Sequence, residues 1–121
     1  MNFEWSVNDS QKLVATLYST NITLNKAACK HFENVQFVLL GLDREKKTIG
    51  IKPIDKISIE QNIYPREQLH RFSLGKSYGR ITNTNFIKQV IHLYDIDISN
   101  PKGVKYDGYY DLHKDVLIIQ L

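Results

Sequence analysis

Hydrophobic and polar positions alternate along several short segments of the chain, which is the pattern of half-buried β-strands. Twice along the chain, such a segment is followed by residues with helical spacing and then by two more strand-like runs. The first of these strand–helix–hairpin units spans residues 19–53, and the second spans residues 77–121. The pattern therefore predicts two units of the same order within one chain.

The first unit contains a short helix and a well-marked hairpin. Asn25 stands where it can cap a helix over residues 26–32. A strand is predicted at 35–42, and its nearly continuous apolar run indicates that both of its faces are covered. Its partner is predicted at 48–52, across a charged tip at 43–47 that belongs in water.

The second unit repeats this order with a longer helix. Asn83 or Thr84 can cap a helix over residues 85–94, whose broad apolar stripe predicts burial. A second hairpin follows, with strands predicted at 104–112 and 115–121. The internal repeat is seen best where the residues NITLN (21–25) of the first unit recur as GRITN (79–83) in the second.

Three further segments alternate like strands, namely residues 13–18, 57–60 and 71–74. The pattern does not place residues 1–18 and 54–76 relative to the two units. No Pro-, Gly- or Ser-rich linker divides the sequence, so a single domain over residues 1–121 is expected. The fold class predicted is α+β, mainly β and barrel-like, with two units in one chain forming a pseudo-dimer.

Composition is consistent with a folded domain in a reducing compartment. Of the 121 residues, 42% are hydrophobic and 24% are charged, which is ordinary for globular proteins. Cys29 is the only cysteine, so no disulfide can form within the chain. No segment approaches the ~20 apolar residues that a transmembrane helix needs, and the N-terminal residues lack the pattern of a secretory signal. A cytoplasmic protein without a membrane partner is therefore expected.

Recognisable catalytic motifs are not evident. The run Gly75-Lys76-Ser77 resembles the end of a phosphate-binding loop, but His70 stands where that motif requires glycine. Cys29 lies in the apolar part of the first helix, where burial explains it better than reactivity. The histidines and glutamates are too scattered to suggest a metal site or an acid–base pair. We therefore expect neither an enzyme, nor a metal, nor a cofactor.

Basic residues give the clearest functional indication. The net charge of +3 permits contact with a polyanion without requiring it. Lysines and arginines gather at one hairpin tip and around the two predicted helix starts, where side chains and backbone amides can reach phosphates. A solvated turn is the competing interpretation for the tip, because Asp43 and Glu45 partly neutralise it. The candidate nucleic-acid-binding residues are Lys26, Arg44, Lys46, Lys47, Lys76 and Arg80, which we expect to form one basic surface with Lys26 at its margin.

The segment 21–28, followed by the apolar strand and by Ile49-Gly50-Ile51-Lys52-Pro53, resembles the strand–helix–hairpin unit of the AbrB/MazE-type swapped-hairpin proteins. Residues 79–82 look like a second copy. The resemblance implies a β-barrel that binds DNA, and hence a transcriptional regulator or an antitoxin-like protein. Together with the placement of the basic residues, it predicts that their surface binds duplex DNA. The Gly-Arg pair of that family stands only in the second unit, at Gly79-Arg80, and the Pro-Lys helix start is missing from both. The segment 24–53 is also similar to small bacterial and phage proteins of unknown role.

A protein-interaction module is the alternative function, for example an accessory protein of a phage or mobile element. Such a module would use an exposed apolar surface or a sheet edge to bind a protein partner or a second copy of itself. Phe3 and Trp5 are candidate anchors, although packing on their own domain is the expectation we favour.

Overall fold

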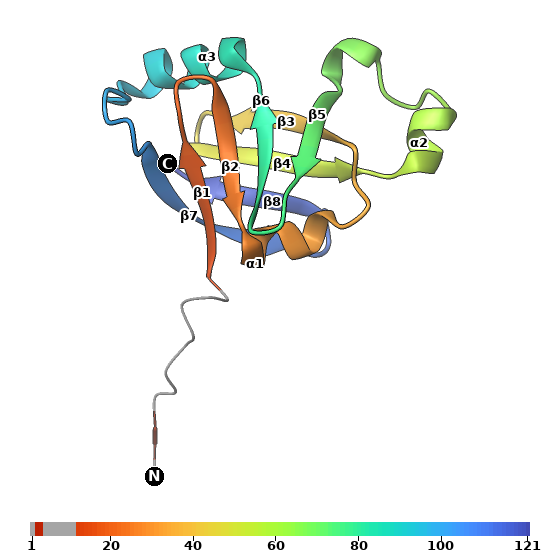
Figure 1. Cartoon of the computed structure of the whole chain (residues 1–121), viewed down its shortest axis with the longest axis horizontal. Coiled ribbons are helices and arrows are strands. Elements are labelled where there is room, and N and C mark those ends of the chain that lie inside the picture. Colours follow the sequence, from red (N-terminus) through yellow and green to blue (C-terminus); the bar gives the residue numbers. More distant parts are fainter. Residues whose placement is uncertain (1, 4–11) are drawn as a thin grey trace.

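The computed structural model describes residues 2–3 and 12–121. Within that part of the chain, eight antiparallel strands close into a barrel in the order β1-β2-β6-β5-β3-β4-β8-β7 (Figure 1). The strands are β1 Leu13–Leu17, β2 Asn21–Asn25, β3 Phe37–Asp43, β4 Thr48–Ile54, β5 His70–Leu74, β6 Tyr78–Thr82, β7 Val104–Asp111 and β8 Val116–Gln120. The α-helices are α1 Lys26–Cys29, α2 Lys56–Glu60 and α3 Thr84–Tyr94, and the 3-10 helices are η2 Lys30–Phe32 and η3 Arg66–Gln68.

Inward-facing aliphatic side chains fill the barrel. In β2 every second residue, Ile22 and Leu24, is buried, and in β4 the buried residues include Ile49 and Ile51. An eight-stranded barrel has an interior just wide enough for such side chains, so the centre is a packed core. α3 lies over one end of the barrel and α1 lies at the other (Figure 1).

Asparagine side chains start the two helices that lie at the barrel ends. Asn25 Oδ1 accepts a hydrogen bond from the backbone N–H of Ala28 at 3.0 Å, and Asn83 Oδ1 accepts one from Phe86 at 3.0 Å. Each side chain satisfies a donor that the first turn of a helix leaves free. The predicted short helix is thus present, although its second part, η2, is 3-10.

Residues 13–54 and 70–120 form two halves with the same strand order. β1 pairs with β2 as β5 pairs with β6, and β3 pairs with β4 as β7 pairs with β8. Each hairpin also pairs with the first strand of the opposite half, since β3 lies beside β5 and β7 lies beside β1. The halves are therefore interleaved. Each is one strand longer than the unit expected from the sequence, because β1 and β5 precede those units.

Both hairpin tips have the same turn structure. Asp43 Oδ1 accepts hydrogen bonds from two backbone amides of the β3–β4 tip, and Asp111 Oδ1 does the same in the β7–β8 tip. Each tip also accepts a hydrogen bond from a side chain of the opposite half. Gln120 Nε2 donates to the carbonyl of Lys46 at 3.2 Å, and Lys52 Nζ donates to the carbonyl of Lys114 at 2.9 Å.

The sequence alignment between the halves is wrong by one residue. The second and fourth residues are buried both in β2, which spans 21–25, and in β6, which spans 78–82. Residues 21–25 therefore correspond to 78–82 and not to 79–83. Because strand side chains alternate between two faces, the one-residue shift would have placed Arg80 in the core.

Two other local expectations are also wrong. Residues 57–60 belong to the helix α2, because Asp55 Oδ1 accepts a hydrogen bond from the amide of Ser58 at 2.7 Å and caps it. In β3 only Val38 is fully buried, so that strand is not covered on both faces. The mainly β, barrel-like architecture is confirmed.

Residues 55–69, which connect the halves and contain α2 and η3, project from the barrel and are called the connecting arm here (Figure 1). Phe3 is 62% exposed and is not packed in the core, and Trp5 lies outside the described residues. None of the helices among the described residues is long and apolar enough to cross a membrane.

Candidate functional site

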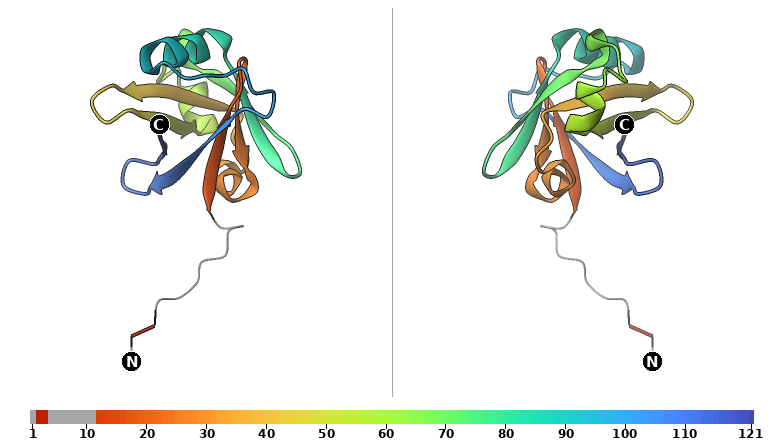
Figure 2. Two further views of the ribbon diagram at one scale, coloured as in Figure 1. Left: turned by 90° about the vertical axis from the view of Figure 1, so that its left-hand side faces the viewer. Right: turned by 90° about the vertical axis from the view of Figure 1, so that its right-hand side faces the viewer.

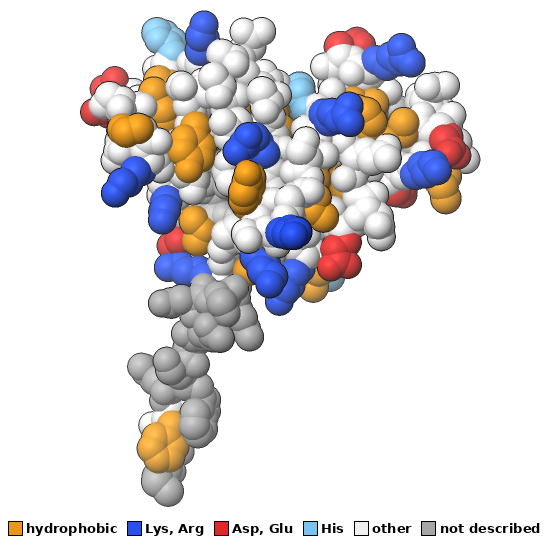
Figure 3. Space-filling view, viewed as in Figure 1, with side chains coloured by type: hydrophobic (Ala, Val, Ile, Leu, Met, Phe, Trp, Pro, Cys, Tyr) orange, Lys and Arg blue, Asp and Glu red, His pale blue; other side chains and the backbone are white. Residues whose placement is uncertain are grey.

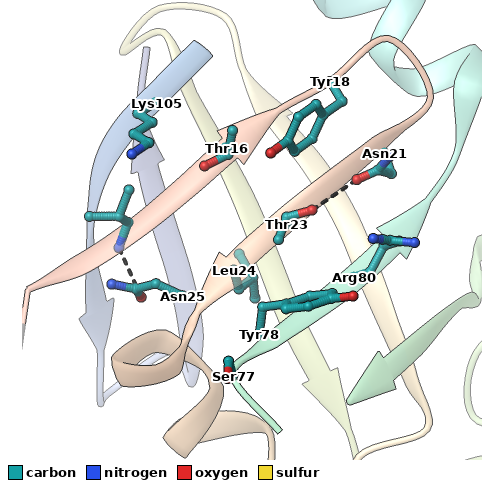
Figure 4. Close-up of a pocket in the computed structure, with 11 residues that line it drawn as sticks. Thr16, Tyr18, Asn21, Thr23, Leu24, Asn25, Ser77, Tyr78, Arg80 and Lys105 are labelled. Carbon is teal, nitrogen blue, oxygen red and sulfur yellow. Dashed lines mark hydrogen bonds between the residues drawn. The ribbon is translucent and has the colours of Figure 1, made fainter. Parts of the chain in front are cut away.

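An open groove of about 760 Å³ lies on the outer surface of the barrel, over β1, β2 and β6 (Figure 4). We call it the outer groove. Nine of its eleven lining residues carry a hydroxyl, amide or cationic side chain, although most of the surface that lines the groove is apolar. The lining residues are Val14, Thr16, Tyr18, Asn21, Thr23, Leu24, Asn25, Ser77, Tyr78, Arg80 and Lys105.

Strand register aligns one row of these side chains across four neighbouring strands. Thr16 of β1 pairs with Lys105 of β7 on one side and with Thr23 of β2 on the other. Thr23 in turn pairs with Arg80 of β6. Neighbouring strands lie about 4.8 Å apart, so the backbones of Lys105 and Arg80 are separated by about 14 Å along this row. Two cations thus flank a pair of threonines.

Arg80 is held over an aromatic ring within the groove. Its guanidinium carbon lies 5.4 Å from the centre of the Tyr78 ring, and both residues belong to β6 (Figure 4). This cation–π contact restricts the arginine while leaving its N–H donors able to bind an anion. Tyr78 is itself 45% exposed, so its ring also offers a surface for stacking.

Hydrogen bonds order the floor of the groove. Thr23 Oγ1 donates to Asn21 Oδ1 at 2.9 Å, as the dashed line in Figure 4 shows. Asn25 Oδ1 accepts from the backbone N–H of Val14 at 3.2 Å, and Asn25 Nδ2 donates to the carbonyl of Lys12. Because Asn25 also caps α1, its side chain joins β1 to the helix. The floor is consequently preorganised.

The outer groove has a positive charge balance, since Arg80 and Lys105 line it and no aspartate or glutamate among the described residues does. At its margin, Lys12 Nζ lies 3.4 Å from Asp107 in an exposed ion pair. Figure 3 shows basic side chains spread over this face of the molecule and acidic ones mostly toward its edges. An anionic ligand would meet little repulsion here.

Three of the six basic residues proposed from the sequence lie in or near the outer groove. Arg80 lines it directly. Lys26 follows Asn25, whose backbone pairs with Tyr78, so it lies at the end of the groove where β6 begins. Lys76 lies in the β5–β6 turn just before that strand. All three are exposed.

The other three residues, Arg44, Lys46 and Lys47, lie elsewhere. They occupy the β3–β4 tip, which projects from the opposite side of the barrel to the β5–β6 hairpin (Figure 2). The structure therefore does not bring the six residues into one surface. The reason is topological, because barrel closure aims these two hairpins in opposite directions.

Several groove residues were not singled out from the sequence, among them Lys105, Tyr18 and Thr16. Thr16 and Lys105 are outward positions on two strands that pair with each other although they are far apart in the sequence, and Tyr18 directly follows β1. The sequence pattern that could have pointed to these groove residues is the alternation of polar with buried residues in 13–18, 21–25 and 78–82. That alternation identifies an outer face but does not tell which strands share it.

Other sequence features have structural explanations. Cys29 is buried, its Sγ donates to the Leu24 carbonyl at 3.6 Å, and burial raises the pKa of its thiol, which disfavours the reactive thiolate. The run 75–77 forms a turn in which the Gly75 N–H donates to the Tyr78 carbonyl at 2.8 Å. The described residues contain no group of three or more His, Cys, Asp or Glu placed to hold a metal ion.

Comparison with protein-family models found no matching family, and comparisons with curated proteins and with solved structures found no significant match.

Proposed function

We propose that this chain binds duplex DNA through the outer groove, as a swapped-hairpin protein of the AbrB/MazE type with both halves in one chain. The biological role would be that of a transcriptional regulator or an antitoxin-like protein. The single observation that carries the proposal is the row of Lys105, Thr16, Thr23 and Arg80, which places cations at both ends of a neutral hydrogen-bonding floor.

The spacing of the cations suits a nucleic-acid duplex. Along the curved row of strands, the backbones of Lys105 and Arg80 are about 14 Å apart, which is similar to the major-groove width of about 12 Å. Long basic side chains at this separation can reach phosphates on both sides of a groove, while Thr and Asn side chains face the base edges. Sheet strands are used in this way by several DNA-binding proteins. Lys26 and Lys76 would extend the phosphate contacts at one end.

The interleaved halves support the pseudo-dimer part of the proposal. Each hairpin pairs with the first strand of the opposite half, as a swapped hairpin would. The two aspartate-capped tips recur at corresponding places, and in each half an asparagine caps the helix that follows the second strand. The connecting arm then takes the role of a tether between two subunits that would otherwise be separate chains.

Fluorescence anisotropy with a labelled random-sequence duplex at low salt is the direct test of binding. We expect saturable binding that weakens as salt rises, because neutralised phosphates release counterions. A labelled single strand of the same length is the comparison. Tighter binding of the single strand would contradict the duplex assignment, and no binding of either at low salt would overturn the proposal.

A protein-interaction module is the second candidate, and the connecting arm favours it. Ile57 is 64% exposed and Ile63 is 56% exposed, both on this arm. Exposed aliphatic side chains on a projecting segment are typical of partner-binding surfaces. Sedimentation velocity of the wild-type chain and of Ile57→Ser/Ile63→Ser tests for self-association through the arm. A monomer in both cases, at concentrations that saturate DNA, would count against homodimerisation.

A further inference from the structure

A second hollow, of about 550 Å³, lies between the β3–β4 tip and the end of α3 and is separate from the outer groove. We call it the tip cavity. It combines apolar walls with two cations and one acidic residue. The lining residues are Arg44, Lys47, Leu93, Tyr94, Asp95, Ile96, Tyr106 and Leu121.

Tyr94 has an unsatisfied hydroxyl at this site. Among the described residues, its oxygen is the one buried side-chain polar atom without a hydrogen-bond partner. A buried hydroxyl without a partner costs free energy, because folding has removed its water without replacing it. Because Tyr94 also lines the cavity, its unpartnered hydroxyl indicates a missing acceptor beside it.

The corresponding corner of the other half shows what that acceptor can be. There, beside the β7–β8 tip, the Tyr110 hydroxyl donates to the carboxylate of Asp115. His31 stacks on the Tyr110 ring with centroids 4.0 Å apart, and Phe32 meets its edge at 6.5 Å. Tyr110 comes from a strand and Tyr94 from a helix, so the two corners are filled differently. In one corner the tyrosine hydroxyl meets an internal carboxylate.

Lys47 takes the place of Asp115 in the β3–β4 tip. Both residues close their turns with positive φ, 53° for Lys47 and 55° for Asp115. The internal anion of one corner is thus replaced by a cation in the other. Within the described residues, neither Lys47 nor Arg44 forms an ion pair. Two unpaired cations and a tyrosine whose buried hydroxyl lacks a partner therefore line the same cavity.

We propose that the tip cavity binds a small organic anion, whose carboxylate or phosphate accepts from Tyr94 and pairs with Lys47 and Arg44. The anion takes the part that Asp115 plays in the other corner. Leu93, Ile96 and the Tyr106 ring would enclose an aromatic or aliphatic body, and the cavity volume is in the range of small-molecule sites. Inorganic ions alone would leave those apolar walls uncovered.

Isothermal titration calorimetry of the full chain with phenyl phosphate and with benzoate tests this site, with uncharged benzyl alcohol as the third probe. At least one anion is expected to bind with 1:1 stoichiometry, and benzyl alcohol at least tenfold more weakly. Lys47→Asp should weaken anion binding by about tenfold or more, and Tyr94→Phe by about three- to tenfold. Asp115 shows that this turn position accepts aspartate, so the Lys47→Asp variant is expected to fold.

Lys46→Ala is the matched control, because Lys46 lies in the same tip without lining the cavity. It should change the affinity by less than about twofold, as should Arg80→Ala in the outer groove. The proposal is overturned if neither anion binds saturably, if benzyl alcohol binds as tightly, or if Lys46→Ala weakens binding as much as Lys47→Asp does. Because the probes carry no nucleic acid, these outcomes do not depend on DNA binding.

Discussion

Lys47 and Asp115 occupy the same position in two turns of the same conformation, with φ values of 53° and 55°, and they carry opposite charges. Each turn is capped by an aspartate, Asp43 in the first and Asp111 in the second. The backbone geometry is thus repeated in the two halves while the chemistry of the side chains differs. One consequence is that the two tyrosines beside these tips should respond in opposite ways to loss of their hydroxyls.

Tyr94→Phe is expected to raise the free energy of unfolding of the unliganded chain by about 1 kcal/mol, because it removes a buried hydroxyl without a partner. Tyr110→Phe is expected to lower it by about 1 kcal/mol, because it removes a hydrogen bond to the Asp115 carboxylate. Urea unfolding followed by circular dichroism measures both. Equal destabilisation by the two variants would contradict the contrast.

Gly79 is required by close packing inside the barrel. A Cβ at this position would lie 2.4 Å from Cζ of Phe72 and 2.9 Å from Sγ of Cys29. Gly79→Ala should therefore destabilise the protein by about 1–3 kcal/mol, which is the usual range for overpacking. Gly41→Ala is the control, since no atom lies within 4 Å of its added Cβ. Denaturant midpoints of the two variants give the comparison, and similar midpoints would be inconsistent with this packing.

Asn25 has a larger structural role than an ordinary helix cap. Besides capping α1, it bonds the N–H of Val14 and the carbonyl of Lys12, which fixes β1 to the start of the helix. Asn25→Ala should lower the free energy of unfolding by about 2 kcal/mol, of which about 1 kcal/mol comes from loss of the helix cap. Asn85→Ala, at an exposed position within α3, should be neutral or slightly stabilising. Thermal unfolding of both variants is the measurement, and equal effects would argue against the linking role of Asn25.

His70 should make stability depend on pH. Its Nδ1 lies 3.0 Å from Asn83 Nδ2 and accepts a hydrogen bond in the neutral ring, and burial lowers its pKa below the usual 6.5. The folded state therefore binds the proton less readily than the unfolded chain does. The contribution of the neutral His70 ring to folding stability is therefore fully present above pH 6.5. It is lost as the pH falls from there through the folded-state pKa. Melting temperatures of the wild type and His70→Gln between pH 5 and 8 should diverge with rising pH, and parallel curves would refute the assignment.

Local pattern was enough to predict most elements of the fold, because they rest on periodicity and turn residues. Both hairpins, the capped helices and the strands at 13–18 and 71–74 follow from alternation, apolar spacing and asparagine caps. The strand prediction for residues 57–60 failed because Ile-Ser-Ile alternates like a strand. The Asp55 cap that makes this segment helical lies outside the alternating residues. The one-residue error between NITLN and GRITN arose because matching letters carry no information on which side chain faces inward.

The candidate site was less predictable, because it depends on barrel closure. Arg80 was identified from the sequence, but Lys105 reaches the same row only through the β7–β1 pairing, which joins residues far apart in the chain. Arg44 and Lys47 looked like neighbours of Arg80 on charge alone, yet they line a different cavity. Charge placement shows which residues can bind an anion, and topology decides which of them act together.

The salt dependence of duplex binding in two matched variants tests the central claim most directly. With contacts from Lys26, Lys76, Arg80 and Lys105, the logarithm of the affinity should fall with the logarithm of salt concentration with a slope of about −3.6. Arg80→Ala/Lys105→Ala should make that slope less negative by about 1.8, because two phosphate contacts are lost. Arg44→Ala/Lys46→Ala/Lys47→Ala, which changes the tip on the other side of the barrel, should leave the slope within experimental error of the wild type. A slope that is unchanged in the first variant and flattened in the second would contradict the assignment of DNA binding to the outer groove.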